Sequence, residues 1–272
     1  MQNYSVLMSV YFKEKAEYLE LAIKSMLNQT ISPEQFVIVE DGPLTDELEQ
    51  VIQKHENGKP DLFTVVRLDE NRGLGLALDE GMKYCRNELV ARMDSDDISM
   101  PERCEKELAV FELHPELDII SGAINEFKGS VDNVVSIRRV PESEEAIKKQ
   151  MRRRSAFNHP AVMYRKASVV QCGGYGGSTR KEDHDLFSRM LNMGCKAYNI
   201  QDSILWYRVG KDNIQRRKSW KNINSYIEIM WINLKRRYCG IDDFVYVVVA
   251  QIFYFIAPVW VIEKLLKKYY RE

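Results

Sequence analysis

Residues 88–103 read ELVARMDSDDISMPER, an apolar segment followed directly by three aspartates within four positions. The segment ELVARM has the composition of a buried strand. Asp94, Asp96 and Asp97 then place like charges close together, which costs free energy unless a cation or hydrogen-bond donors compensate. The stretch therefore predicts a strand that ends in a charged site.

Strands and helices alternate regularly around this stretch. β-Branched apolar runs predict strands at residues 4–11, 35–41, 62–68, 88–94 and 118–127. Amphipathic periodicity predicts helices at residues 17–30, 45–56, 76–85 and 102–114, with Thr45 as a candidate N-cap. This order predicts an α/β fold with right-handed crossovers and a mainly parallel sheet, flanked by helices on both faces.

The second half of the chain is less regular. Residues 130–140 suggest an extended or hairpin excursion, residues 141–154 a helix opened by Pro141, and residues 160–167 another strand. After the glycine-rich turn CGGYGG, residues 182–194 predict a helix that Gly194 closes.

The C-terminal tail is apolar for nineteen residues, 244–262. As a helix it would measure roughly 28 Å at about 1.5 Å per residue, which is marginal against a hydrocarbon core of about 30 Å. Pro258 interrupts the run and both flanks are basic, so one crossing cannot keep both flanks on the cytoplasmic side. The tail favours a shallow or re-entrant membrane anchor bent near Pro258. The alternative is a helix buried against the domain.

Composition limits the class of protein. The chain has 272 residues, 45% hydrophobic and 29% charged, which is typical of a globular protein with one sizeable core. With a net charge of −1 the protein as a whole is not attracted electrostatically to nucleic acid, so no nucleic-acid partner is expected. Five widely spaced cysteines indicate a reducing compartment, and the N-terminus shows no secretory signal, so a cytoplasmic location is expected.

Three predicted strands end in polar clusters: Glu40 with Asp41, Arg67 with Asp69, and the aspartates of residues 94–97. In an open parallel sheet, ligands bind beyond the carboxyl ends of the strands. One such cluster could be only a turn or a helix cap, whereas three that meet in one crevice indicate a site.

Asp94 and Asp96 are two positions apart, so in extended chain their carboxylates lie on the same side and can approach one cation. A hard ion such as Mg²⁺ or Mn²⁺ takes one or two protein carboxylates and completes its shell with phosphate oxygens and water. This predicts a phosphorylated partner. Asp97 could instead cap the helix whose first turn holds Pro101 and Glu102.

These motifs resemble the inverting glycosyltransferases of family 2, which have the GT-A fold. The resemblance covers about residues 4–217 and is carried by YSVLMSVYFKEK, FVIVEDGPLTD, NRGLGLALDEGMKYCRNELVARMDSDDISMPER, NHPAVMYRKASVVQCGGY, KEDHDLFSRMLNMG and WYRVGKDNIQRR. It implies a catalytic domain at residues 1–217, with a nucleotide-sugar half at about 1–100 and an acceptor half at about 101–217. Residues 218–272 would form a helical tail.

The resemblance also implies roles for individual residues. The nucleotide of a nucleotide-sugar, most often a UDP-sugar, would lie against Val10, Glu40, Asp41, Arg67 and the turn Asn71, Arg72, Gly73. Asp96 would be the main metal ligand, and Asp94 would lie nearer the ribose or the sugar. Asp183 of the Glu182–Asp183 pair would be the catalytic base, which the positive end of a helix dipole would keep ionised.

Other positions carry weaker expectations. His159 and Glu182 would line the acceptor side, although a lone histidine before a proline is as often structural. Many relatives carry a histidine that holds the diphosphate soon after the YR segment, but here Lys211 or Arg216 would substitute for it. Asp79 stands where relatives often have asparagine.

The leading hypothesis is a metal-dependent, inverting transfer of a hexose to a glycan or lipid-linked acceptor in surface polysaccharide biosynthesis. The enzyme would act at the inner face of the cytoplasmic membrane, held there through residues 243–272. Two alternatives are a sugar-phosphate nucleotidyltransferase and a non-catalytic nucleotide-binding module of a membrane assembly. The first would need a glycine-rich loop after the first strand, where SVLMSVYFKEK has no glycine.

Overall fold

The computed structural model describes residues 2–176, 181–210, 218–262 and 264. Its helices are α1 (Ala16–Leu27), α2 (Asp46–Gly58), α3 (Leu74–Tyr84), α4 (Arg103–Leu113), α5 (Glu144–Met151), α6 (Lys166–Gln171), α7 (Glu182–Asn192), α9 (Trp220–Lys235) and α10 (Ile241–Ile256). Its strands are β1 (Tyr4–Val10), β2 (Gln35–Glu40), β3 (Phe63–Arg67), β4 (Leu89–Asp94), β5 (Ile98–Ser99), β6 (Ile119–Phe127), β7 (Val134–Arg138), β8 (Met163–Arg165) and β9 (Ala197–Arg208).

The strands form one sheet in the order β3-β2-β1-β4-β8-β6-β9-β5, with β7 paired to β6. The pairs among β1 to β4 are parallel, as is the pair of β6 with β9, whereas β5, β7 and β8 run antiparallel to their neighbours. The predicted α/β sheet is therefore confirmed. The hairpin expected at residues 130–140 is also present, as β7 folded back on β6.

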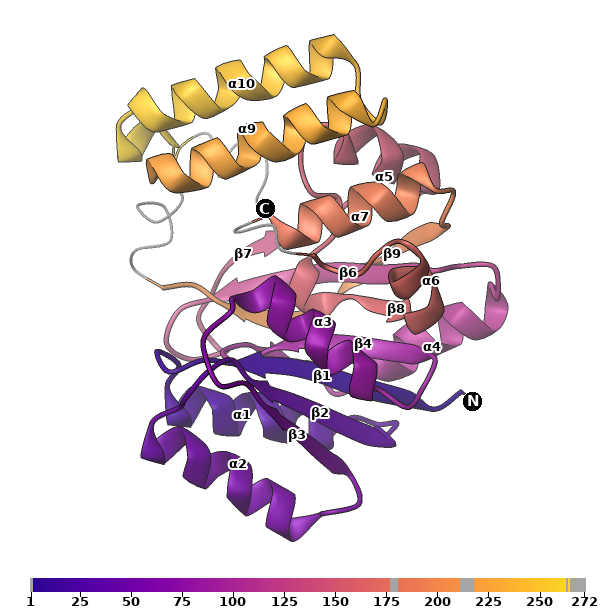
Figure 1. The fold of residues 1–272 in the computed structure, drawn as a ribbon, viewed down its shortest axis with the longest axis vertical. Coiled ribbons are helices and arrows are strands. Elements are labelled where there is room, and N and C mark those ends of the chain that lie inside the picture. The colour runs from indigo at the N-terminus through magenta and orange to yellow at the C-terminus, as the bar shows by residue number, and fades with distance from the viewer. Residues whose placement is uncertain (1, 177–180, 211–217, 263, 265–272) are drawn as a thin grey trace.

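Both faces of the sheet are covered, as Figure 1 shows. Side chains of α1, α2 and α4 share one apolar core with the sheet, and side chains of α3, α5, α6 and α7 share the other. Successive residues of β2 alternate between the two cores: Phe36 and Ile38 pack on one face, Val37 and Val39 on the other. Burial on both faces explains the continuous apolar runs that predicted these strands.

Some expected boundaries were wrong. The helix expected to open at Pro141 begins at Glu144, because the Ser143 hydroxyl caps it by accepting a hydrogen bond from the backbone N–H of Ala146. The strand expected over residues 160–167 is only Met163–Arg165, because a 3₁₀ turn at His159–Ala161 takes its beginning. Asp97 does not cap α4, whose N-cap is Glu102.

The tail forms a helical hairpin of α9 and α10, which lies over α5 and α7 in Figure 1. Met230, Cys239 and Val247 form a small apolar core of its own between the two helices. Helix α10 ends at Ile256 and the chain turns at Ala257 and Pro258, which confirms the expected break near Pro258. In the described part of the chain, no helix is both long and apolar enough to cross a bilayer.

Candidate active site

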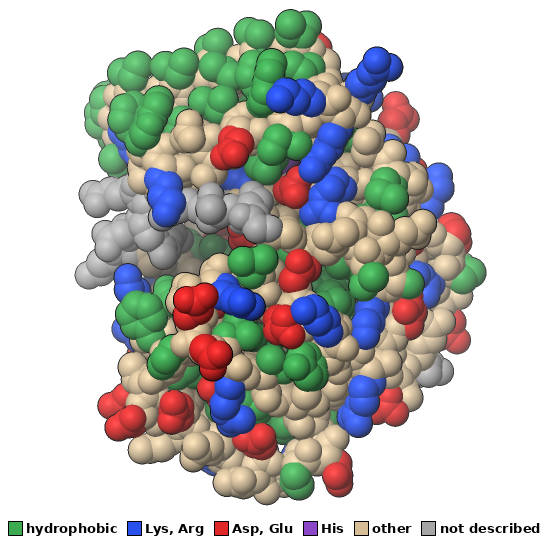
Figure 2. All heavy atoms as spheres, viewed as in Figure 1, with side chains coloured by type: hydrophobic (Ala, Val, Ile, Leu, Met, Phe, Trp, Pro, Cys, Tyr) green, Lys and Arg blue, Asp and Glu red, His purple; other side chains and the backbone are tan. Residues whose placement is uncertain are grey.

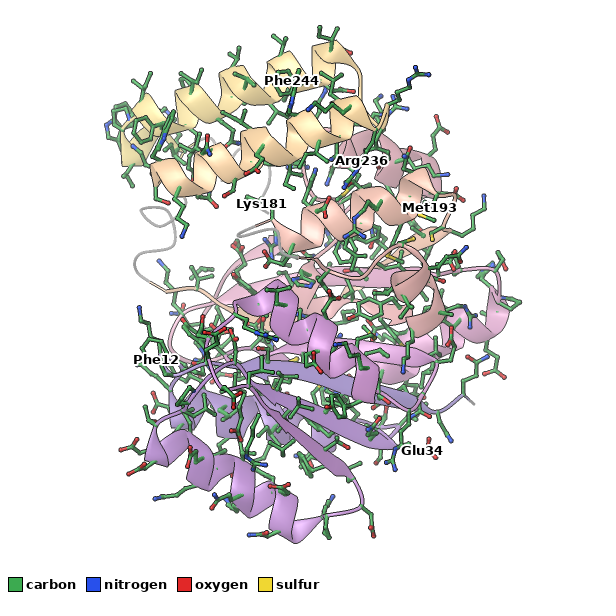
Figure 3. The ribbon with its side chains drawn as sticks, viewed as in Figure 1. Phe12, Glu34, Lys181, Met193, Arg236 and Phe244 are labelled. Carbon is green, nitrogen blue, oxygen red and sulfur yellow. The ribbon has the colours of Figure 1, made fainter. Side chains whose placement is uncertain are left out.

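The carboxyl ends of four parallel strands form one edge of the site. The register places Val10 of β1 beside Glu40 of β2, Glu40 beside Arg67 of β3, and Ser9 beside Asp94 of β4. In Figure 3, Phe12, just after β1, marks this edge, and Glu34, just before β2, marks the opposite one. The strand ends predicted to share a crevice are therefore neighbours.

Glu40 and Arg67 form an ion pair at this edge. The Nε atom of Arg67 lies 3.4 Å from Oε1 of Glu40, whose side chain is almost fully buried. Burial raises the pKa of the Glu40 carboxyl, and the charge of Arg67 partly offsets that rise. A buried carboxylate beside a half-exposed guanidinium provides acceptors and donors for a polar ligand such as a nucleoside.

Asp41 binds the turn at residues 71–73. Its carboxylate accepts hydrogen bonds from the backbone N–H of Arg72 at 2.7 Å and of Gly73 at 3.0 Å, and the Asn71 amide donates to its backbone carbonyl at 3.1 Å. Gly42 has φ +82°, and a Cβ there would lie 2.6 Å from the Asn71 nitrogen. Only glycine allows this close approach. Two segments predicted to surround the nucleotide are thus fixed to one another.

The three aspartates of the opening stretch form one cluster. A carboxylate oxygen of each of Asp94, Asp96 and Asp97 lies within 4.8 Å of the others. Burial, together with the charges of Asp94 and Glu14, raises the pKa of Asp96 to about 7. Burial and the charges of Asp96 and Asp94 also raise the pKa of Asp97 well above its usual value. The cluster thus lacks enough positive charge around it to balance three ionised carboxylates.

Two arginines border this cluster, and the sequence alone had not singled out either for the site. Arg92 is fully buried and donates to Asp94, while its Nε and Nη1 atoms have no hydrogen-bond partner within the described residues. The backbone N–H of Arg208, at the end of β9, donates to Asp97 at 2.8 Å, and its Nε donates to the Asp96 carbonyl at 2.8 Å. The role expected for Asp97 is corrected accordingly: its carboxylate joins the segment after β4 to the end of β9.

Glu182 and Asp183 occupy the first turn of α7, whose start lies against the start of α3. A Cβ on Gly75 of α3 would lie 3.0 Å from Cβ of Glu182. Burial and the neighbouring Asp183 charge raise the pKa of Glu182 to about 7. Burial alone would raise the pKa of Asp183 too, but His159, Lys181, His184 and the His184 backbone N–H together lower it. One carboxyl is thus partly protonated near neutral pH while its neighbour stays ionised, a separation typical of acid–base sites.

His159 is a buried histidine near both Asp94 and Asp183. Its Nε2 atom is 2.9 Å from the Tyr175 hydroxyl. Burial and the nearby Arg92 charge lower its pKa to about 3, against the opposing influence of Asp183 and Asp94. The ring is therefore neutral at pH 7 and hydrogen-bonded to Tyr175, which agrees with the structural alternative. The charges of Asp183 and Asp94 both act on His159, so both carboxylates lie near its ring.

Asp79 holds the glycine-rich turn that precedes α7. Its carboxylate accepts hydrogen bonds from the backbone N–H groups of Tyr175 at 2.6 Å and Gly176 at 3.1 Å. An aspartate suits this place because it offers one acceptor oxygen to each donor. The expected phosphate contacts Lys211 and Arg216 lie outside the described residues.

Comparison with known proteins gives a consistent result. The sequence profile described as "Glycosyl transferase family 2" matches residues 5–174. The chain is 40% identical over 216 residues to an uncharacterised glycosyltransferase of Haemophilus influenzae, covering 79% of each chain. It is 35% identical over 237 residues to the amylovoran biosynthesis glycosyltransferase AmsE of Erwinia amylovora, covering 87% of this chain and 88% of that one. It is 34% identical over 259 residues to the UDP-Gal:alpha-D-GlcNAc-diphosphoundecaprenol beta-1,3-galactosyltransferase of Escherichia coli, covering 94% and 92%.

Solved structures share the fold at lower sequence identity. Residues 1–349 of S. aureus TarS superpose with a TM-score of 0.65 at 18% identity, over 93% of this chain and 72% of that one. A mannosyltransferase of Pyrobaculum calidifontis, solved with GDP-Man and Mn²⁺, also has a TM-score of 0.65. Its sequence identity is 16%, and the match covers 96% of this chain and 72% of that one. These matches, with the curled and mainly parallel sheet, confirm the GT-A fold. The chain belongs to glycosyltransferase family 2.

Proposed function

We propose that this glycosyltransferase moves a hexose, with inversion, from a nucleotide-sugar to a lipid-linked or growing glycan. The observation that carries the proposal is the separation of the Glu182 and Asp183 pKa values, together with the nearness of both Asp183 and Asp94, the last residue of β4, to His159. Residues 1–100 would supply the donor half of the site and residues 101–217 the acceptor half.

The donor would be a UDP-sugar at the carboxyl edge of β1 to β4. Val10 and the Glu40–Arg67 pair would contact its base and ribose, and the turn that Asp41 fixes would close over the base. The Asp183 carboxylate takes the proton from the acceptor hydroxyl as the hydroxyl oxygen forms a bond to the anomeric carbon, while the bond from that carbon to the diphosphate oxygen breaks.

A divalent cation fits the aspartate cluster. Asp94, Asp96 and Asp97 bring carboxylate oxygens within 4.8 Å, and a buried oxygen of Asp97 has no hydrogen-bond partner among the described residues. Mg²⁺ or Mn²⁺ accepts such a set of hard oxygen ligands. Asp96 and Asp94 would hold the ion, which would neutralise negative charge on the departing diphosphate.

The relatives and the tail support the proposed acceptor class. One relative is named for transfer to a diphosphoundecaprenol-linked sugar, and another for polysaccharide biosynthesis. Helix α10 exposes apolar side chains, among them Val249 at 61% and Ile256 at 73%. Figure 2 shows hydrophobic side chains gathered over α10, whereas charged side chains are interspersed on the rest of this face. Such a surface is typical of proteins that lie on a membrane, so we place the enzyme at the cytoplasmic face, attached through residues 243–272.

Two experiments test these proposals. A panel of nucleotide-sugars, scored by Mn²⁺-dependent thermal shift and then by hydrolysis of the best binder, should identify a UDP-sugar. The absence of any metal-dependent binder would contradict the proposed donor.

Vesicle flotation tests attachment to the membrane. Val249→Ser/Ile256→Ser should weaken it, whereas the matched control Leu113→Ser/Val170→Ser, on exposed apolar residues elsewhere, should not. Equal flotation of wild type and Val249→Ser/Ile256→Ser would count against the anchor.

A further inference from the structure

A cavity of about 990 Å³ lies outside the catalytic edge, between α5, the segment that follows it, and the α9–α10 hairpin. Its lining includes five basic side chains: Arg138, Lys149, Arg152, Arg153 and Arg154. Two carboxylates, Asp242 and Asp243, also line it. The net positive charge of this basic cavity suits an anion with more than one negative charge.

The two carboxylates are already occupied by one arginine. Nε of Arg153 lies 2.5 Å from Asp243 and Nη2 lies 3.3 Å from Asp242, while its guanidinium lies over the Tyr246 ring at 4.6 Å. This network ties the start of α10 to the segment after α5. Lys149 and Arg152 form no ion pair within the described ranges, so their charges are available to a ligand.

Helix α10 presents two different faces. Asp243, Tyr246, Ala250 and Tyr254 recur at helical spacing and line the basic cavity. Val245, Val249, Ile252 and Ile256 recur on a nearly opposite face and are exposed at 52%, 61%, 47% and 73%. A basic cavity and an open apolar surface therefore lie on two faces of the same helix, and a ligand with a charged head and a long flexible apolar chain can reach both.

Tyr226 of α9 connects the basic cavity to the catalytic carboxylates. Its hydroxyl donates to the Arg153 carbonyl at 2.8 Å, and it also lines the cavity. Its ring contacts the His184 ring with 5.6 Å between centroids, and Nζ of Lys181 lies over it at 4.9 Å. Lys181, labelled in Figure 3 at the start of α7, and His184 flank Asp183 in sequence. A ligand in the basic cavity thus lies one side chain away from the residues that flank the proposed base.

We propose that the basic cavity binds the diphosphate of a prenyl-diphosphate-linked acceptor, with the prenyl chain along the exposed face of α10. Lys149 and Arg152 contact the phosphates, and Arg153 shapes the site. The sugar at the other end of the diphosphate then extends past Tyr226 toward Asp183. This assignment rests on the proposed function and adds the place where the acceptor's charged group binds.

Binding of farnesyl diphosphate to the full-length protein tests the assignment without any donor. Wild type should bind this probe more tightly than farnesol or inorganic diphosphate, by at least about 10-fold. Lys149→Ala/Arg152→Ala should weaken binding by about 10-fold or more, since each phosphate contact with a cation is a charge-assisted bond. The control Lys221→Ala/Lys235→Ala removes two exposed charges from α9 that do not line the cavity, and should change binding less than about 2-fold.

Three results would overturn the assignment: no binding of farnesyl diphosphate by wild type, equal binding by Lys149→Ala/Arg152→Ala, or full competition by UDP with Mn²⁺. Equal weakening of farnesyl diphosphate binding by the control Lys221→Ala/Lys235→Ala would indicate general attraction to anions and would also overturn the assignment. The same holds if Lys149→Ala/Arg152→Ala loses binding to phosphatidylglycerol vesicles as strongly as it loses binding to farnesyl diphosphate. UDP-sugar hydrolysis by Lys149→Ala/Arg152→Ala should match wild type. If wild type binds the probe but turns over no nucleotide-sugar, the cavity assignment stands and the proposed function fails.

Discussion

Replacement of Asp183 by asparagine tests the proposed base with little change in shape. The amide keeps an oxygen that can accept from the His184 backbone N–H, a bond that the Asp183 carboxylate makes. It removes the negative charge that Lys181 and the His184 backbone N–H stabilise. The variant should therefore fold, but it has no carboxylate to take the proton from the hydroxyl of the sugar acceptor.

The size of the effect follows from the environment of Asp183. A well-placed general base contributes about 10²- to 10⁴-fold. Because its neighbours lower the pKa of Asp183 below the usual value, it is a weak base and its contribution should lie in the lower part of that range. We expect kcat to fall by about 10²- to 10³-fold, roughly 3 to 4 kcal/mol of barrier at about 1.4 per decade.

The assay is release of UDP in the presence of acceptor, with kcat and the donor KM measured separately. The donor KM should change less than about threefold, because Asp183 lies on α7 and not on the strand ends proposed to bind the donor. Glu182→Gln is the matched control: Glu182 has a pKa of about 7, so the variant should resemble wild type more closely at pH 6 than at pH 8. If Asp183→Asn keeps more than a tenth of the wild-type kcat, Asp183 is not the base.

Three further predictions concern the metal, a buried histidine and the glycine-rich turn. The Mn²⁺-dependent thermal shift given by UDP should disappear in Asp96→Asn and in EDTA; an unchanged shift would argue against the metal site. His184 is buried and its pKa is lowered to about 4 from about 6.5, so wild type loses stability as pH falls through this range. The free energy of unfolding in urea should fall less for His184→Phe than for wild type between pH 7 and pH 4, by about 3 kcal/mol, since one pKa unit is about 1.4 kcal/mol. If the two proteins differ in this free energy by the same amount at both pH values, the prediction is refuted. Asp79→Ala should lower unfolding stability by about 1 to 3 kcal/mol, because the N–H groups of Tyr175 and Gly176 lose their acceptor; an unchanged melting temperature would show that the turn holds without it.

The sheet and its strand-end site were predictable because their signals are local. Apolar runs buried on both faces marked β1 to β4, and the polar residues Glu40, Arg67 and Asp94 ended them in register. Parallel pairing then brought those ends together. The apolar run and Pro258 likewise predicted the end of α10.

Features that depend on contacts between distant segments were not predictable. Asp97 looked like a helix cap, but its partner is the backbone of Arg208, 111 residues later in the chain. Arg92 looked like part of an apolar strand, and only the fold places its buried guanidinium beside Asp94. The basic cavity combines α5 with the α9–α10 hairpin, which no short motif joins.

The stereochemistry of the product tests the central claim most directly. The enzyme would be given Mn²⁺, a UDP-α-linked hexose identified by the panel, and a prenyl-diphosphate-linked sugar, and the new linkage would be assigned by proton NMR. Attack by the acceptor hydroxyl, with its proton taken by Asp183, predicts a β linkage. An α linkage would contradict the proposed mechanism.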